Sequence, residues 1–350
     1  MKPISLQQDV NLLHYNTFKF PCIARYFVEI ENSNDLIALM QMPVWNTTPN
    51  KLMLWWWSNI LLATEYFDGL VIKQAIKGKT LIEQTDRTVT IEVWWWEEWH
   101  WFVERSIDQW YYGIENLIAI PWSVGAAPMQ NIWAYGVEVC SVIDAVTYID
   151  LEYWTIHTID KSACQFWYRQ SLFKQALRHK ICILSVTFTL GIYNNKTYKP
   201  LLTYAGIQET LKQQWSDTDA PTPRNVADAI ATIRAEKLPD RHRIGTAWSF
   251  FKNPLIPEKE AHSILTKHPT LKTYPAPHSM VKFSAWELID RAWCKWFTQW
   301  AVGTYNKHAL VLIHRWWAQW TELLALAQTI QNRVYKMFGI MLDMEVNLIE

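Results

Sequence analysis

Residues 113–136 read GIENLIAIPWSVGAAPMQNIWAYG, a run of small and apolar residues that contains two prolines and three glycines. Small residues at this density let the backbone approach a flat or anionic ligand closely. A packing loop rich in glycine and alanine would have the same composition. Taken alone, this stretch leaves a ligand-binding loop and a packing loop as alternatives.

The segments on either side of this stretch have patterns of both strands and helices. Apolar or β-branched runs predict strands at 51–54, 60–62, 70–76, 81–93 (a hairpin with its turn at 85–87), 142–149, 155–159 and 181–190. Helical spacing predicts helices at 34–42, 99–109, 223–238 and 321–338. We expect Ser33 or Asn34 to be the N-cap of the first helix and Gly339 to be the C-cap of the last. This order predicts an α+β protein with more than one domain.

Composition and charge limit the class of protein. The chain has 350 residues with 33 basic and 33 acidic side chains, so its formal charge is zero and gives no reason to expect a nucleic-acid partner. Neither a secretory signal nor an apolar run of about 18 residues is apparent, so we expect no membrane span. The five scattered cysteines include no CxxC pair. We therefore expect reduced thiols in a cytoplasmic protein. We also expect a monomer without a metal site.

One feature of the composition is abnormal. The chain has 10 Gly and 23 Trp, although average usage predicts about 25 glycines at this length. Tryptophans occur in runs at 55–57, 94–96 and 316–317. Clustered tryptophans can form stacking platforms for bases or sugars, so a binding role has to be weighed against a simpler explanation.

Further motifs follow residues 113–136 along the chain. They are FWYR at 166–169, KLPD at 237–240, SFFKNP at 249–254 and MEV at 344–346. Singly, each could be a surface arginine, a turn serine or an exposed glutamate. In this order they resemble the UDP-N-acetylenolpyruvoylglucosamine reductase family, and the resemblance runs from Asn16 to about Glu345.

The resemblance implies a three-domain α+β flavoprotein. Two domains would bind FAD in the manner of vanillyl-alcohol-oxidase-like flavoproteins, and a third would bind the substrate. Carried onto this chain, the first domain would be residues 1–76 with a C-terminal strand in 340–350. The second would be 77–238 and the third 239–339.

The resemblance also implies a reaction and its catalytic residues. NADPH would reduce FAD, and the flavin would then reduce UDP-N-acetylglucosamine enolpyruvate to UDP-N-acetylmuramate, a peptidoglycan precursor. Arg169 matches the arginine that stabilises charge on the substrate carboxylate. Ser249 matches the proton donor, and Glu345 matches the second acidic group near the enolate.

Binding residues carry over in the same way. The positions that would contact the substrate are Tyr204, Lys237 and Asn253. Of these, Lys237 has a direct electrostatic reason, since a cation attracts a diphosphate. The positions that would contact FAD are Ser58, Asn59, Ser123, Gly125, Ala126, Ile132 and Tyr135.

The chain departs from the family mainly at glycines. Tryptophan stands at nine positions where the family has glycine: Trp55, Trp57, Trp94, Trp96, Trp122, Trp133, Trp167, Trp248 and Trp286. Trp293 and Trp296 are matched to family glycines as well. Glu287 stands where the family has tryptophan. Three explanations are open: a codon read as glycine in the organism, an artificial variant, or a degraded cofactor site. Two functions follow, an active flavoenzyme or a non-catalytic, aromatic-rich binding protein on a degraded flavoprotein scaffold.

Overall fold

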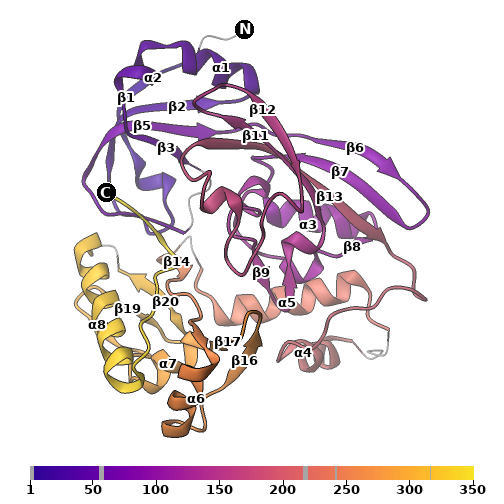
Figure 1. Cartoon of the computed structure of the whole chain (residues 1–350), viewed down its shortest axis with the longest axis vertical. Coiled ribbons are helices and arrows are strands. Elements are labelled where there is room, and N and C mark those ends of the chain that lie inside the picture. The colour runs from indigo at the N-terminus through magenta and orange to yellow at the C-terminus, as the bar shows by residue number, and fades with distance from the viewer. Residues whose placement is uncertain (1–3, 55–58, 216–219, 241–242, 316) are drawn as a thin grey trace. The chain divides into compact units, whose positions relative to one another are not determined.

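The computed structural model describes residues 4–54, 59–215, 220–240, 243–315 and 317–350. These residues form two compact units, which we describe separately (Figure 1). The first unit comprises residues 4–10, 24–54 and 68–234 within the described ranges. The second comprises residues 11–23, 59–67 and 235–350 within the same ranges.

The first unit contains a four-stranded sheet in the order β1 (Gln7–Asn11), β2 (Ile23–Ile30), β5 (Tyr66–Gln74), β3 (Lys51–Leu54). Strands β3 and β5 are parallel. Helices α1 (Ser33–Gln41) and α2 (Pro43–Thr47) contribute Leu36, Leu39 and Val44 to a buried cluster with the strand residues Val28 and Leu70.

The start of α1 differs from the prediction by one residue. Asn32, not Ser33 or Asn34, is the N-cap. Its side chain accepts a hydrogen bond from the Asp35 amide, and the Asp35 carboxylate accepts one from the Asn32 amide, which makes a capping box. The helix therefore begins where two backbone donors are satisfied reciprocally.

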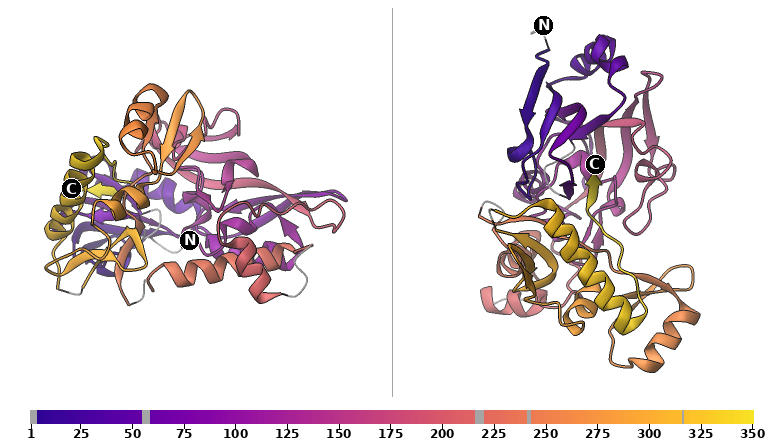
Figure 2. Two further views of the ribbon diagram at one scale, coloured as in Figure 1. Left: turned by 90° about the horizontal axis from the view of Figure 1, so that it is seen from below. Right: turned by 90° about the vertical axis from the view of Figure 1, so that its left-hand side faces the viewer.

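The larger sheet of the first unit is antiparallel, in the order β12 (Ile156–Asp160), β11 (Ile143–Asp150), β13 (Ile181–Ile192), β7 (Thr88–Trp94), β6 (Lys79–Gln84). A short strand, β8 (Tyr111–Tyr112), also pairs with β13. The side chains of β6 are exposed, and its hairpin with β7 projects outward (Figure 2). The other helices of the first unit are α3 (Trp99–Asp108), α4 (Ile207–Gln214) and α5 (Pro223–Lys237), of which the last ends in the second unit. The strands predicted here are confirmed, whereas β8 and α4 carry no clear pattern in the sequence.

The second unit contains an antiparallel sheet, β14 (Gly245–Ser249), β20 (His308–His314), β19 (Val302–Tyr305), β18 (Thr298–Gln299). A smaller sheet has the order β15 (Leu255–Pro257), β17 (Met280–Phe283), β16 (Thr273–Ala276). Strand β4 (Ile60–Leu62) pairs in parallel with β21 (Asn347–Ile349). The helices are α6 (Glu258–Lys267), α7 (Ala285–Arg291) and α8 (Trp320–Phe338).

Helix α8 packs as its sequence pattern predicts. Five residues at helical spacing along α8 form a buried stripe: Leu323, Ala327, Ile330, Val334 and Phe338. Helices α7 and α8 contact β20 and β19 respectively, and they also contact each other (Figures 1 and 2). The long α8 stripe thus closes the core of the second unit.

The α+β class is confirmed by these elements. The division into three domains stays a prediction. Each of the five cysteines is a free thiol. Within the described ranges, no helix combines the length and hydropathy that a membrane crossing requires.

Candidate functional site

In the second unit, backbone pairing brings Ser249 and Glu345 to one place, although they lie far apart in the sequence. An antiparallel bridge joins Phe251 to Met344. The Glu345 amide donates to the Phe250 carbonyl at 2.8 Å, and the Lys252 amide donates to the Asp343 carbonyl at 2.9 Å. Ser249 therefore ends β14 directly beside the segment that carries Glu345.

A bulge in β14 sets the position of Ser249. Thr246 pairs with Ile313, and Ser249 pairs with Val311. Three residue steps on β14 thus oppose two on β20, which is the definition of a β-bulge. Trp248 lies in the bulge with φ 69, and its amide donates to the Thr246 hydroxyl at 3.1 Å. Ser249 is the next residue in the chain after this left-handed residue.

Asn59, a predicted FAD contact, joins the same cluster. Its side-chain amide donates to the Glu345 carbonyl at 3.3 Å, and its own carbonyl accepts from the Asn347 amide at 3.0 Å. Asn59 is buried and left-handed, with φ 65. The other residue predicted from this motif, Ser58, lies outside the described residues.

Asn253 and Lys237, the two predicted substrate residues of the second unit, differ in how their side chains are held. Asn253 accepts a hydrogen bond from the Ala285 amide at 2.9 Å through its side-chain oxygen, so it is held against the first residue of α7. Lys237 is the exposed last residue of α5. Among the described residues, none forms an ion pair with its ammonium group.

In the first unit, Arg169 stands at the tip of a tight turn. The Trp167 amide donates to the Gln170 carbonyl at 3.0 Å, and the Gln170 amide donates back to Trp167 at 3.0 Å. Arg169 is the second central residue of this turn and has φ 57. The turn is tied to residues 129–131: Lys174 donates both to the Arg169 carbonyl and to the Gln130 side chain, and Asn131 donates to the Trp167 carbonyl.

The glycine- and alanine-containing stretch around Ser123 pairs with the chain just after β7. The Val124 amide donates to the Glu97 carbonyl at 2.8 Å, and the Gly125 amide donates to the Trp95 carbonyl at 3.1 Å. A 3-10 helix spans Val124–Ala126. Four of the predicted FAD contacts lie in or near this stretch: Ser123, Gly125, Ala126 and Ile132.

Tyr135 and Tyr204 meet in the first unit. Their ring centroids are 4.8 Å apart with an interplanar angle of 63°. Trp133 and Ala134 form a short strand, β9 (Trp133–Ala134), which pairs with β10 (Val137–Glu138), and Tyr135 lies in the turn between them with φ 49. The structure thus joins a predicted cofactor contact to a predicted substrate contact.

Arg234 belongs to this cluster and was missed by sequence reasoning. Its guanidinium hydrogen-bonds to the hydroxyl of Tyr135. Burial lowers the pKa of Arg234, and the nearby Tyr135 opposes that shift. Burial raises the pKa of Tyr135, and Arg234 lowers it. The available signal was its position one helical turn before Lys237, because residues three apart share a helix face.

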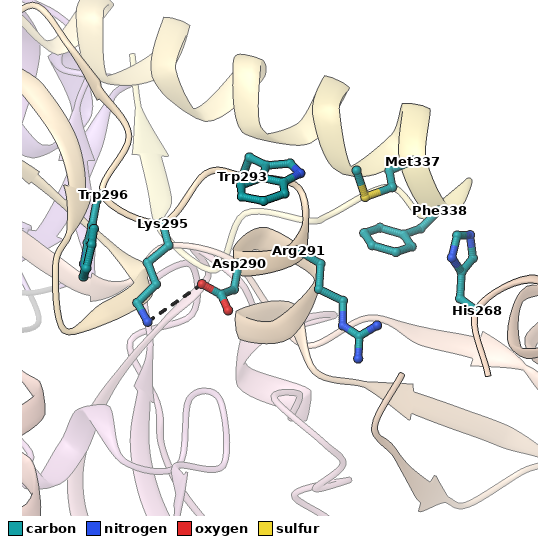
Figure 3. Close-up of a pocket in the computed structure, with 8 residues that line it drawn as sticks. All are labelled: His268, Asp290, Arg291, Trp293, Lys295, Trp296, Met337 and Phe338. Carbon is teal, nitrogen blue, oxygen red and sulfur yellow. Dashed lines mark ion pairs between the residues drawn. The ribbon is translucent and has the colours of Figure 1, made fainter. Parts of the chain in front are cut away.

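A surface hollow of ≈ 670 Å³ lies elsewhere in the second unit. It is lined by residues of α7, the loop after α7 and the end of α8, among them Asp290, Trp293, Lys295, Trp296 and Phe338 (Figure 3). Lys295 is 3.8 Å from the Asp290 carboxylate. None of the predicted site residues contributes to its lining, so the hollow is separate from them.

The fold and sequence comparisons agree on the class of protein. Residues 239–349 match the model of the UDP-N-acetylenolpyruvoylglucosamine reductase C-terminal domain. The crystal structure of UDP-N-acetylenolpyruvylglucosamine reductase from Thermus caldophilus matches with a TM-score of 0.63 and 18% identity, covering 99% of each chain. That likeness shows the fold alone, an α+β architecture over the whole chain.

Curated relatives identify the family. The UDP-N-acetylenolpyruvoylglucosamine reductase of Chromobacterium violaceum is 36% identical over 343 residues, covering 98% of both chains. The enzyme of the same name from Burkholderia vietnamiensis is 37% identical over 343 residues, covering 98% of this chain and 97% of its own. The chain therefore belongs to the UDP-N-acetylenolpyruvoylglucosamine reductase family.

Gly125 tests whether the chain as written leaves room for a flavin. A Cβ added at Gly125 would come within 1.9 Å of the Trp95 ring, so the indole covers the face that a glycine would offer to a ligand. Trp95 and Trp96 are both buried. The polar residues of the predicted site are present. At Gly125, however, the Trp95 side chain occupies the space that a cofactor would need.

Proposed function

We propose that this protein, in the form that its own cells make, reduces UDP-N-acetylglucosamine enolpyruvate to UDP-N-acetylmuramate with FAD and NADPH. The reaction would be a cytoplasmic step of peptidoglycan precursor synthesis. The supporting observation is the backbone pairing that brings Ser249 beside the segment of Glu345, to which Asn59 is hydrogen-bonded. Family membership supports the same substrate and reaction.

Two residues of the second unit have chemical roles in this proposal. A reduced flavin would supply the hydride that adds to the enol-ether double bond. The Ser249 hydroxyl would donate the proton that the neighbouring carbon needs, and a hydroxyl suits a strongly basic enolate despite its high pKa. Glu345, on the adjacent segment, would contribute its carboxyl group to the same centre.

The remaining residues would bind and orient the substrate. Arg169 would stabilise negative charge that grows on the substrate carboxylate, because a preorganised cation favours the transition state over the ground state. Lys237 would attract the diphosphate. Tyr204 and Asn253 would fix the nucleotide sugar, since each is already held in place, by a ring contact and by a hydrogen bond respectively.

The proposal is tested with protein that carries glycine at the eleven tryptophan positions that match family glycines and also at Trp95, whose ring covers Gly125. We expect a yellow protein that oxidises NADPH only when UDP-N-acetylglucosamine enolpyruvate is supplied. A folded protein that stays colourless and inactive would contradict the proposal.

The role of Ser249 is tested in the same background by Ser249→Ala. A proton donor is needed only when the substrate is reduced, so this variant should slow flavin reoxidation by substrate on the order of 100-fold or more. Flavin reduction by NADPH should be unchanged in stopped-flow traces. Ser263→Ala, on the exposed face of α6, is the matched control and should change neither step. Equal slowing of both steps by Ser249→Ala would reject the role.

A further inference from the structure

Tryptophan and glycine share an unusual backbone conformation in this protein. The chain has 23 tryptophans, of which the structure describes 19, and six of these 19 have φ between 53 and 69. They are Trp110, Trp154, Trp248, Trp293, Trp296 and Trp300. Five of the 10 glycines have positive φ, whereas all other residue types together supply eleven such residues. A bulky side chain is disfavoured in this region and glycine is not, so the tryptophans are distributed like glycines.

Two of the six stand where helices end. After α7, the Trp293 amide donates to the Asp290 carbonyl and the Cys294 amide donates to the Ile289 carbonyl. These two bonds define a Schellman motif, in which the left-handed residue is usually glycine. Trp110 takes the equivalent position after α3, whose C-cap is Gln109. Helix α8 also ends on a left-handed residue, and there it is a glycine, Gly339, at φ 72.

Two more stand in hairpin turns. Gln299 pairs with Val302, so Trp300 and Ala301 form a two-residue loop. Only the first loop residue, Trp300, is left-handed, and in the matching hairpin turn, type II′, glycine is the expected residue at that position. Trp154 is left-handed in the loop between β11 and β12, where its amide donates to the Asp150 carbonyl at 2.9 Å.

The bulge at Trp248 is the fifth case. A left-handed residue in a bulge of this kind is ordinarily glycine, because it has no Cβ to collide with its own backbone. The sixth, Trp296, lies in the loop between α7 and β18. Five of the six positions are therefore ones at which the local geometry independently favours glycine.

Exposure points in the same direction. Trp293, Trp296 and Trp300 are 81%, 68% and 73% exposed. Two of them, Trp293 and Trp296, line the hollow in Figure 3. An aromatic platform for a sugar would need exposed rings, but it would not need a left-handed backbone beneath each ring. The side chains that shape this hollow thus stand on backbone suited to glycine.

We propose that these six positions are glycine in the protein as its own cells make it, which means that the corresponding codon is read there as glycine. This inference rests on backbone dihedral angles and local hydrogen bonds, and it does not depend on the proposed function. It adds Trp110, Trp154 and Trp300 to the positions that the family resemblance alone singles out. It also removes two aromatic walls from the hollow.

Peptide masses of the protein purified from its own cells decide the matter, and they require no folding or activity. Trypsin releases residues 296–307, which contain Trp296 and Trp300. We expect this peptide to be lighter by two tryptophan-to-glycine differences. The peptide 26–51 contains Trp45, a buried residue of α2 with ordinary φ, and serves as a measure of tryptophan incorporation at a core position. Finding both tryptophans in peptide 296–307 would overturn the proposal.

The physical basis is tested by a matched pair of variants of the chain as written. Trp300→Gly removes an exposed left-handed tryptophan, and Trp101→Gly removes a 54% exposed tryptophan from the first turn of α3. We expect Trp300→Gly to raise Tm by roughly 2–4 °C and Trp101→Gly to lower it slightly. A fall in Tm for both variants would show that the backbone at 300 does not favour glycine. Flavin binding is not measured in either experiment, so failure here is distinguishable from failure of the proposed function.

Discussion

The packing around Trp99 in the first unit and the loop around Trp293 in the second use the same residue type in opposite ways. Trp99 is fully buried, and its indole nitrogen donates to the Leu117 carbonyl at 2.8 Å. Its ring meets Phe102 and Phe188 edge-on at centroid distances of 5.8 and 5.9 Å. Trp293 is 81% exposed, and its backbone is left-handed.

This contrast separates tryptophans that the fold requires from those that it only tolerates. At Trp99, the side chain supplies buried area, aromatic contacts and a hydrogen bond, so glycine could not replace it. At Trp293, the backbone conformation is what the fold requires, and the side chain buries little. The local geometry at each position therefore shows whether the fold requires the tryptophan side chain or only tolerates it.

Removing the buried indole should have the largest effect. Trp99→Ala leaves a cavity and an unsatisfied Leu117 carbonyl, and we expect the free energy of unfolding to fall by about 3–5 kcal/mol. Urea denaturation followed by circular dichroism measures the change. A loss below about 1 kcal/mol would remove the distinction between Trp99 and Trp293.

The same buried region contains an acid whose charge opposes folding. Glu115 accepts from the Gly113 amide at 2.6 Å and from the Tyr198 hydroxyl at 2.9 Å. Burial raises the pKa of Glu115 above its usual value of 4.5, although these hydrogen bonds lower it. A raised folded-state pKa contributes stability that is fully present below pH 4.5 and is lost as pH rises through the folded-state value.

Glu115→Gln should abolish this pH dependence while keeping the side chain's shape. Stability of the variant relative to the parent should therefore increase as pH rises above 4.5. Unfolding curves collected across that range measure it. Glu83→Gln, on the exposed strand β6, is the control and should leave the pH dependence of the parent in place. An identical pH dependence in parent and Glu115→Gln would mean that Glu115 is not the titrating group.

A reciprocal pair of variants at two helix ends isolates the effect of the backbone. Nothing lies within 4 Å of a Cβ added at Gly339, so Gly339→Ala costs only the left-handed conformation, about 1–2 kcal/mol. Trp293→Gly should give a gain of similar size at the end of α7. Chemical denaturation of both variants provides the measurement, and effects of the same sign would break the parallel between the two helix ends.

The smallest effect is expected at Trp248, where the two influences oppose each other. Trp248 is left-handed but only half-buried, so Trp248→Gly relieves backbone strain and loses some packing. We expect a net gain in unfolding free energy of less than about 1 kcal/mol. Thermal denaturation measures it. A loss of more than about 2 kcal/mol would place Trp248 with Trp99 among the tryptophans that the fold requires.

Local patterns determined much of the first unit and the last helix of the second unit from the sequence. The strands at 81–93, 143–150 and 181–192 and the helices at 99–108, 223–237 and 320–338 follow from residue periodicity and cap residues, which act over a few neighbours. Most of residues 239–319 carried no prediction of helices or strands, because their strands are short and the chain there pairs with distant segments. The turn that holds Arg169 and the bulge before Ser249 likewise follow from pairing that no local pattern expresses.

The sequence by itself determined the family and the order of its motifs, and with them the candidates Arg169, Ser249 and Glu345. Only the tertiary structure decided which candidates meet. It placed Asn59 and Phe250 against Glu345, joined Tyr135 to Tyr204, and added Arg234 to them. It also decided which tryptophans lie on left-handed backbone, since φ at a turn or helix end is set by the hydrogen bonds that close it. The physical reason is range: motifs are contiguous in sequence, whereas pairing and burial join residues hundreds of positions apart.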